Sequence, residues 1–177
     1  MSSEMYVGFA DGASRHTCNL ASAAWVIYSP TGQLVAVGGA CLGPASNNVA
    51  EYRAVIELLW DALSRGITQL EVRLDSQLVV SQLNRAYQVR NPTLLRQFMQ
   101  IRLLERHFEV ITFNHIPRNQ NSLTDACKLY FGLASHTHFI KLYSKHIKTL
   151  VNKLTTNTNI YIYMCVCVCV CVWNNCL

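Results

Sequence analysis

The sequence predicts one α/β domain over residues 1–135, built on a mixed five-stranded sheet with elements in the order βββαβααβα. Two observations carry this prediction. Short runs with strand-like alternation are interleaved with segments of helical periodicity. A chain of 177 residues also has room for a single core, so that a second domain would be very small. Such an order gives two or three layers, with helices packed on the sheet.

Three antiparallel strands are expected first. The run "MYVGFADG" is short and apolar, and it ends at Asp11-Gly12. The longer stretch "SAAWVIYSPTGQLVAVGGACL" contains two strand-like runs around "SPTG". Since Ser, Pro and Gly favour a tight turn, this stretch predicts a hairpin.

The stretch "NNVAEYRAVIELLWDAL" predicts a helix over residues 47–63, with Asn47 and Asn48 as its capping residues. Its apolar positions recur on one stripe of the helix, namely Ala54, Val55, Leu58, Leu59 and Ala62. Glu51 lies in the middle of that stripe. A carboxylate that faces a core is costly without an ion pair, a metal or a raised pKa, so Glu51 is expected to have partners.

The remaining elements follow in order. "ITQLEVRLDS" predicts a fourth strand that ends at Asp75, and "SQLVVSQLNRA" a short helix. "PTLLRQFMQIRLLERH" predicts a further helix with Pro92 in its first turn, and "FEVITFNHI" a fifth strand. Asn121 is then expected to cap a last helix that carries Asp125. Trp25, Tyr52 and Trp60 are interpreted as packing residues rather than as base-stacking ones.

Four acids stand where these elements could converge: Asp11, Glu51, Asp75 and Asp125. If the first and fourth strands are parallel neighbours, their carboxylates project together. Four like charges would repel or take up protons unless cations lie among them. An oxygen-only set without His or Cys suits Mg²⁺ or Mn²⁺, and a pair of such ions is typical of phosphodiester hydrolysis.

The stretches "YVGFADGAS", "NNVAEYRAVIELL", "LEVRLDSQLVVSQLN" and "FNHIPRNQNSLTDA" together resemble the type 1 ribonuclease H family, in particular its plant and retroelement-related, reverse transcriptase-like branch. The resemblance spans roughly residues 5–134. It implies an RNase H-like fold and endonucleolytic cleavage of the RNA strand of RNA–DNA hybrids with Mg²⁺. It also implies that Asp11, Glu51, Asp75 and Asp125 are the catalytic, metal-binding acids.

The resemblance also covers residues that would contact the nucleic acid. In this region the sequence differs from the usual family pattern. The family's glycine- and asparagine-containing turn is replaced by "ASRHTCNLASAA", which leaves Asn19 as its candidate. "NRAYQVRNPTLL" is too short for the basic protrusion of some members, so that Arg85, Arg90 and Arg96 form either a reduced basic face or an ordinary solvated surface. The expected contacts are Gly12, Asn19, Asn48, Ser76, Gln77, Arg90 and Arg118.

Two of these assignments leave alternatives open. Ser76 and Gln77 are interpreted either as contacts to the nucleic-acid backbone or as plain helix-capping residues. His115, at the end of the fifth strand, is either close to the site or a structural histidine.

Residues 136–177 are expected to be an unstructured or artefactual extension. "IYIYMCVCVCVCVW" alternates strictly, as an AT repeat running into a GT repeat would encode, although an interaction strand or a metal or membrane segment remain alternatives.

Residues 1–135 hold 11 of the 15 Lys and Arg residues and all 10 acids, so the net charge of +5 comes mainly from the extension. The positive net charge of the chain is therefore weak evidence for a nucleic-acid partner.

The leading function is a ribonuclease acting on RNA–DNA hybrids. The alternatives are a binding module whose catalysis has lapsed and a non-functional, retroelement-derived fragment. We expect a monomer without an organic cofactor or a membrane partner. Since the first residues lack a basic segment followed by a long apolar run, the nucleus or cytoplasm is the default compartment.

Overall fold

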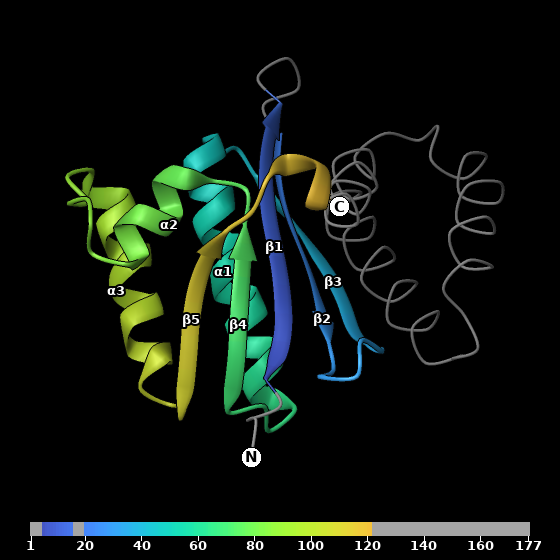
Figure 1. Cartoon of the computed structure of the whole chain (residues 1–177). Coiled ribbons are helices and arrows are strands. Elements are labelled where there is room, and N and C mark those ends of the chain that lie inside the picture. Colours follow the sequence, from blue (N-terminus) through green and yellow to red (C-terminus); the bar gives the residue numbers. More distant parts are fainter. Residues whose placement is uncertain (1–4, 16–19, 122–177) are drawn as a thin grey trace, which may run out of the picture.

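The computed structural model describes residues 5–15 and 20–121. In these ranges it contains five strands, three α-helices and one 3₁₀ turn (Figure 1). In chain order they are β1 (Tyr6–Arg15), β2 (Leu20–Tyr28), β3 (Leu34–Gly43), α1 (Asn47–Ser64), β4 (Gln69–Leu74), α2 (Gln77–Leu83), α3 (Pro92–Glu105), β5 (Val110–His115) and η1 (Arg118–Gln120). The first eight elements follow the predicted order βββαβααβ. The predicted last helix lies outside the described residues, as does the proposed extension at 136–177.

The sheet is mixed, and its strand order is β3-β2-β1-β4-β5. β1 pairs with β2, and β2 with β3, in antiparallel fashion, as predicted for the first three strands. β4 joins the other side of β1 in parallel, and β5 then joins β4 in parallel. The parallel neighbours β1 and β4 therefore end at the same edge of the sheet.

The main core lies between the sheet and the helices. α1 crosses behind the sheet, and α2 and α3 lie on that same side (Figure 1). The alternation of β4 explains its part in the core, because Leu70, Val72 and Leu74 are buried while Glu71 and Arg73 are only half-buried on the other face. A smaller apolar cluster of Ala24, Val26 and Val37 lies on the opposite face of the sheet, because Ala24 and Val26 alternate along β2 with residues of the main core.

α1 buries the predicted stripe and begins at Asn47 as predicted, but its cap lies one residue earlier than expected. Ser46 is the N-cap, and its Oγ accepts a bond from the Val49 amide at 3.4 Å. Asn47 is the first helical residue, so the prediction that Asn47 and Asn48 cap the helix was wrong. A serine hydroxyl satisfies the free amides of the first turn equally well, which leaves the Asn47 side chain available for other bonds.

The hairpin turn between β2 and β3 is confirmed at "SPTG". The Gly32 amide donates to the Ser29 carbonyl at 2.9 Å, and Gly32 has a φ of +80°, a conformation that favours glycine.

Tyr52 connects α1 to the short helix α2. Its side chain is fully buried, and its hydroxyl donates to Oε1 of Gln82 at 2.8 Å. Burial raises the pKa of Tyr52 to about 12, so this phenol remains a neutral donor over the ordinary pH range. The packing role predicted for Tyr52 is confirmed.

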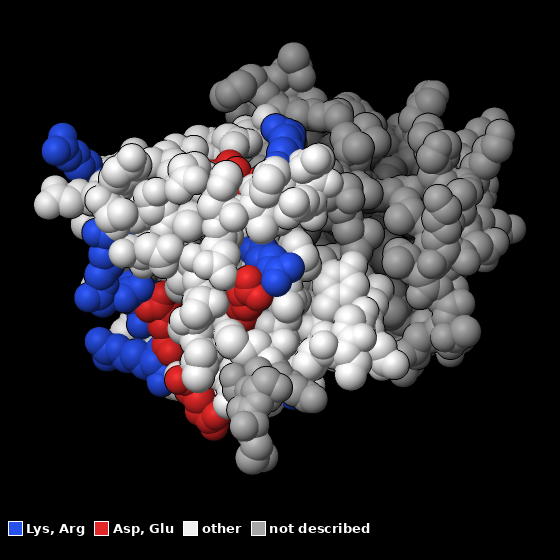
Figure 2. Space-filling model, in the orientation of Figure 1, with Lys and Arg blue, Asp and Glu red and all other residues white. Residues whose placement is uncertain are grey.

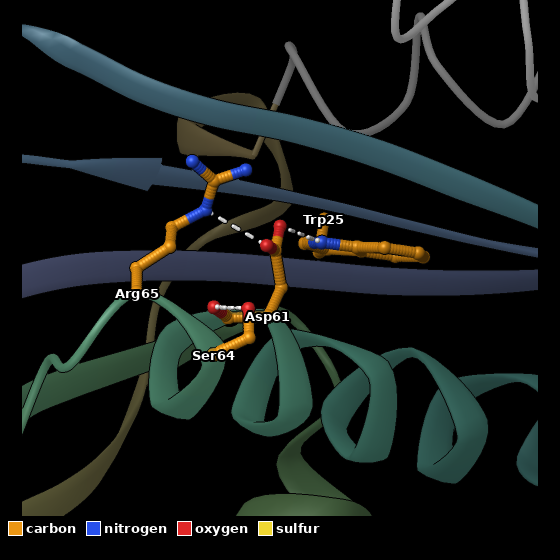
Figure 3. Close-up of polar contacts among 4 residues, drawn as sticks. All are labelled: Trp25, Asp61, Ser64 and Arg65. Carbon is orange, nitrogen blue, oxygen red and sulfur yellow. Dashed lines mark hydrogen bonds and ion pairs between the residues drawn. The ribbon is translucent and has the colours of Figure 1, made fainter.

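Trp25 ties β2 to the C-terminal half of α1 (Figure 3). Its Nε1 donates to Oδ2 of Asp61 at 2.9 Å, and the other carboxylate oxygen of Asp61 accepts from Nε of Arg65 at 2.8 Å. The indole packs over Gly38, where a Cβ would lie 2.2 Å from the ring. Trp25 is therefore a packing residue, as predicted.

Trp60 departs from its predicted packing role. Its side chain is 53% exposed, on the outward face of α1. Trp60 does not belong to the buried stripe of Ala54, Val55, Leu58, Leu59 and Ala62, which agrees with its exposure.

None of the helices in residues 5–15 and 20–121 is long and apolar enough to cross a bilayer.

Replacing Trp25 by Phe should lower the free energy of unfolding by about 1.5–3 kcal/mol, because it removes a hydrogen bond to a largely buried carboxylate. Equilibrium urea unfolding followed by far-ultraviolet circular dichroism measures the loss. Trp60→Phe is the matched control, and its exposed side chain should change the value by less than about 0.5 kcal/mol. Equal losses in the two variants would contradict the role assigned to the Trp25–Asp61 bond.

Candidate active site

The parallel pairing of β1 and β4 places two of the predicted acids at the same level of the sheet. The final pair in this register is Phe9 with Arg73; Asp11 lies two residues beyond Phe9, and Asp75 lies two residues beyond Arg73. Asp75 directly follows β4, as predicted. The side chain of Asp11 is only 4% exposed.

The predicted end of the first strand was wrong. β1 does not stop at Asp11-Gly12 but continues to Arg15, because β2 goes on pairing with it beyond the point where β4 ends, including Asp11 with Ala24. Asp11 is therefore held on a paired strand rather than on a loop. Pairing with β2 fixes the position of Asp11 on one side of β1. On the other side of β1, the register with β4 has already ended at Phe9.

Gly12 allows the N-terminal turn of α1 to approach β1 closely. A Cβ on this residue would lie 2.1 Å from the carbonyl carbon of Ala50 and 2.2 Å from the amide nitrogen of Glu51. These are backbone atoms, so a side chain here would displace the helix itself. Gly12, which was expected to contact nucleic acid, is buried against α1, and this packing accounts for the glycine.

Glu51 has the partners that its place on the apolar stripe required. Nδ2 of Asn47 donates to its Oε1 and Oγ of Ser76 donates to its Oε2, each at 2.8 Å. Asn47 in turn reaches β1, since its Oδ1 accepts from the Ser14 amide at 3.3 Å. Glu51 is thus linked to both strands that flank the site.

Ser76 occupies the N-cap position of α2, but within the described residues its side chain makes no capping bond. Its hydroxyl donates to Glu51 instead. The capping alternative for Ser76 is therefore wrong, and no local sequence signal could have found a partner 25 residues away.

Asp11, Glu51 and Asp75 line one small pocket, together with Ala10, Leu74, Ser76 and Val79. Three carboxylates from β1, α1 and the end of β4 thus face a common space. Asp125, the fourth predicted acid, lies outside the described residues. Among the residues that are described, no three carboxylate, imidazole or thiol groups are placed to hold one ion. The donor set nevertheless consists of oxygen atoms alone, which fits a hard divalent cation.

Asn121 was predicted only as a helix cap, yet it also supports this site. Its side chain is 1% exposed, and its Nδ2 donates to the carbonyl of Ala10, next to Asp11, at 3.3 Å. The two residues are 111 positions apart, so that only the fold brings them together.

The other predicted contact residues that the structure describes do not line this pocket. Asn48 is half-buried in the first turn of α1, and Gln77 is exposed at the start of α2, where its Nε2 donates to Oγ of Ser81. Arg90 and Arg118 are exposed, before α3 and in η1 respectively. Asn19 lies outside the described residues.

His115 is exposed at the end of β5 and pairs in register with Leu74, the residue before Asp75. The strand that carries His115 is thus adjacent to β4, the strand that Asp75 follows.

The opposite face of β4 carries a charged pair. Arg73 forms two bonds to the carboxylate of Glu71, at 2.9 and 2.8 Å, and its guanidinium lies over the ring of Phe9. The hydrogen bond from Arg73 holds the pKa of Glu71 below its ordinary value, and a bond from Asn114 lowers it further. Glu71 consequently stays ionised in its ion pair and is no candidate for proton transfer.

The strand order and the acidic pocket define an RNase H-like domain. The model of the family described as "Reverse transcriptase-like" matches residues 9–128, and the chain belongs to that family. The resemblance drawn from the four sequence motifs is thereby confirmed, and with it the RNase H-like fold.

Known proteins agree with this assignment. The chain is 41% identical over 118 residues to a ribonuclease HI of Halobacterium salinarum, covering 67% of this chain and 59% of that protein. It thus spans about three fifths of the length of this curated relative. The crystal structure of RNase H1 from the same archaeon is 38% identical, with a TM-score of 0.69 over 72% of this chain and 96% of that one. LC11-RNase H1, solved in complex with an RNA/DNA hybrid, is 32% identical, with a TM-score of 0.65 over 68% and 91% of the two chains.

Replacing Gly12 by Ala should lower the free energy of unfolding by about 3 kcal/mol or more, because the new methyl group would overlap the backbone of α1. Gly66→Ala is the control: Gly66 has a φ of +73° but open space around it, so strain of about 1–2 kcal/mol is expected. Urea unfolding of both variants measures the difference. A loss in Gly12→Ala no larger than that in Gly66→Ala would contradict the close approach described here.

Proposed function

We propose that the chain is a ribonuclease that hydrolyses the RNA strand of RNA–DNA hybrids endonucleolytically. The observation that carries the proposal is the pocket where Asp11, Glu51 and Asp75 meet from three different elements. Similarity to ribonucleases HI supports the reaction, and the relative solved with an RNA/DNA hybrid supports the substrate. We extend both to this chain on the basis of the shared fold.

The acids of this pocket are proposed to hold Mg²⁺, with Mn²⁺ as an alternative. Asp11, Glu51 and Asp75 would be ligands, with Asp125 as the fourth. When bound, a pair of such ions supplies an activated water as nucleophile and stabilises the negative charge on the leaving oxygen, which gives 3′-hydroxyl and 5′-phosphate products. The protein's part is to fix the carboxylates: Asp11 by strand pairing, and Glu51 by Asn47 and Ser76.

Selectivity for a hybrid is proposed to come from contacts with the sugars and the backbone, since 2′-hydroxyl groups distinguish the RNA strand. Asn48 lies in the first turn of α1, the helix that carries Glu51, and Gln77 lies in the first turn of α2, two residues after Asp75. Arg118, which is exposed in η1, is proposed as a further contact, and the predicted contact Asn19 lies outside the described residues. No sequence specificity is expected from contacts of this kind.

Arg90 is proposed to hold the nucleic-acid backbone at a distance from the acids. Figure 2 shows that Lys and Arg side chains gather along the side of the molecule where α2 and α3 lie. The exposed residues that contribute there include Arg85, Arg90 and Arg96. Because phosphate contacts release counterions, binding through them weakens steeply with salt.

A second candidate, a hybrid-binding module without catalysis, is favoured by one observation. Within the described ranges, no three ligand groups are placed around one ion. Cleavage assays separate the two candidates.

The full chain should cleave a labelled RNA–DNA hybrid in the presence of Mg²⁺, and should leave single-stranded and double-stranded RNA intact. Asp75→Asn should reduce the rate by about 100-fold or more, because one charged ligand of the reacting centre is lost. Glu109→Gln is the matched control: this exposed acid lies at the opposite end of the sheet, beside the start of β5, and should cleave normally. Hybrid binding without cleavage by the folded wild-type chain would establish the second candidate instead.

Arg90→Ala should weaken hybrid binding and lower the slope of log Kd against log salt concentration by about 1, as expected for the loss of one phosphate contact. Fluorescence anisotropy with a labelled hybrid in EDTA, over a series of salt concentrations, measures the slope. Arg53→Ala is the control, because Arg53 is engaged with Glu57 on α1. An unchanged slope in Arg90→Ala would show that Arg90 belongs to an ordinary solvated surface.

A further inference from the structure

Glu51 differs from the other acids of the pocket in how it is held. Asp11 lies on a paired strand and Asp75 directly follows one, whereas Glu51 has a longer side chain with more rotatable bonds. Its carboxylate plane is set by two donors at opposite oxygens, Asn47 at Oε1 and Ser76 at Oε2, both at 2.8 Å. Two such bonds fix both the position and the rotation of the carboxylate.

The two donors are themselves anchored on different parts of the fold. Asn47 lies one turn before Glu51 on α1 and is joined to β1 through the Ser14 amide, and the Ser14 hydroxyl donates to the Ala45 carbonyl at 2.6 Å. Ser76 follows Asp75 at the junction of β4 and α2. Glu51 is thus held between the strand that carries Asp11 and the residue next to Asp75.

A carboxylate oxygen has two lone pairs, so a hydrogen bond to such an oxygen does not exclude a cation at the same oxygen. The hydrogen bonds are therefore compatible with a cation bound to the same carboxylate. Outer residues that orient a ligand in this way generally strengthen metal binding, because the ligand does not have to be ordered when the ion arrives.

We propose that Ser76 and Asn47 are positioning residues that pre-orient Glu51 for a divalent cation. This inference rests on the proposed function, because it assumes that Glu51 is a metal ligand. It assigns Ser76 a role different from that of a nucleic-acid contact: its hydroxyl acts on the cation site through Glu51.

The test is Mg²⁺ binding by the full-length chain without nucleic acid, measured by isothermal titration calorimetry. Ser76→Ala should weaken Mg²⁺ binding by about 10-fold, the lower end of the range for outer residues of metal sites. Ser76→Thr keeps the hydroxyl and should stay close to the wild type. Asn47→Ala should act in the same direction as Ser76→Ala. Ser64→Ala is the matched control, since its hydroxyl also bonds an oxygen of α1 but at the other end of the helix.

Hybrid affinity in EDTA provides the second measurement, and Ser76→Ala should leave it unchanged. Unchanged or tighter Mg²⁺ binding in Ser76→Ala would overturn the proposal, as would a loss of hybrid affinity with normal Mg²⁺ binding. Asp75→Asn tests the proposed function separately. If this variant binds Mg²⁺ as the wild type does, the acidic pocket is not the cation site, whatever the result for Ser76.

Discussion

The parallel pairing of β1 with β4 is the constraint on which the rest of the site depends. It sets Asp11 and Asp75 at equivalent heights on neighbouring strands, although 63 residues separate them in the chain. A shift of one residue in this register would turn one of the two side chains to the other face of the sheet, because side chains alternate along a strand. The buried Leu70, Val72 and Leu74 oppose such a shift, since they would lose their contacts with the helices. Packing of the core thereby fixes the geometry of the acids.

The position of α1 is the second constraint, and it acts at both ends of the helix. At the N-terminal end, Gly12 lets the helix backbone approach β1 and brings Glu51 to the pocket. Toward the C-terminal end, the bond between Trp25 and Asp61 holds the helix against β2. The two contacts hold α1 against the sheet at both of its ends.

The charges of the site illustrate how a cluster of acids is tolerated near a core. Asp11 is almost fully buried on a paired strand, and Glu51 accepts two hydrogen bonds from neutral donors. Neutral donors stabilise a carboxylate without cancelling its charge. By contrast, Glu71 on the other face of β4 is engaged with Arg73, which satisfies its charge within the protein. The two kinds of partner separate a candidate reactive carboxylate from a structural one.

The sequence by itself determined the strand and helix order through β5, the antiparallel start of the sheet and three of the acids that meet in the pocket, because alternation, helical periodicity and turn residues act over short distances. It also identified Glu51 as a residue that needed partners. Only the tertiary structure decided which partners these are: Ser76 and Asn47 for Glu51, Asn121 beside Asp11, and Asp61 for Trp25. It also extended β1 to Arg15, moved the cap of α1 to Ser46 and left Trp60 exposed. Most of these contacts join residues that are distant in the chain, and no local pattern encodes them.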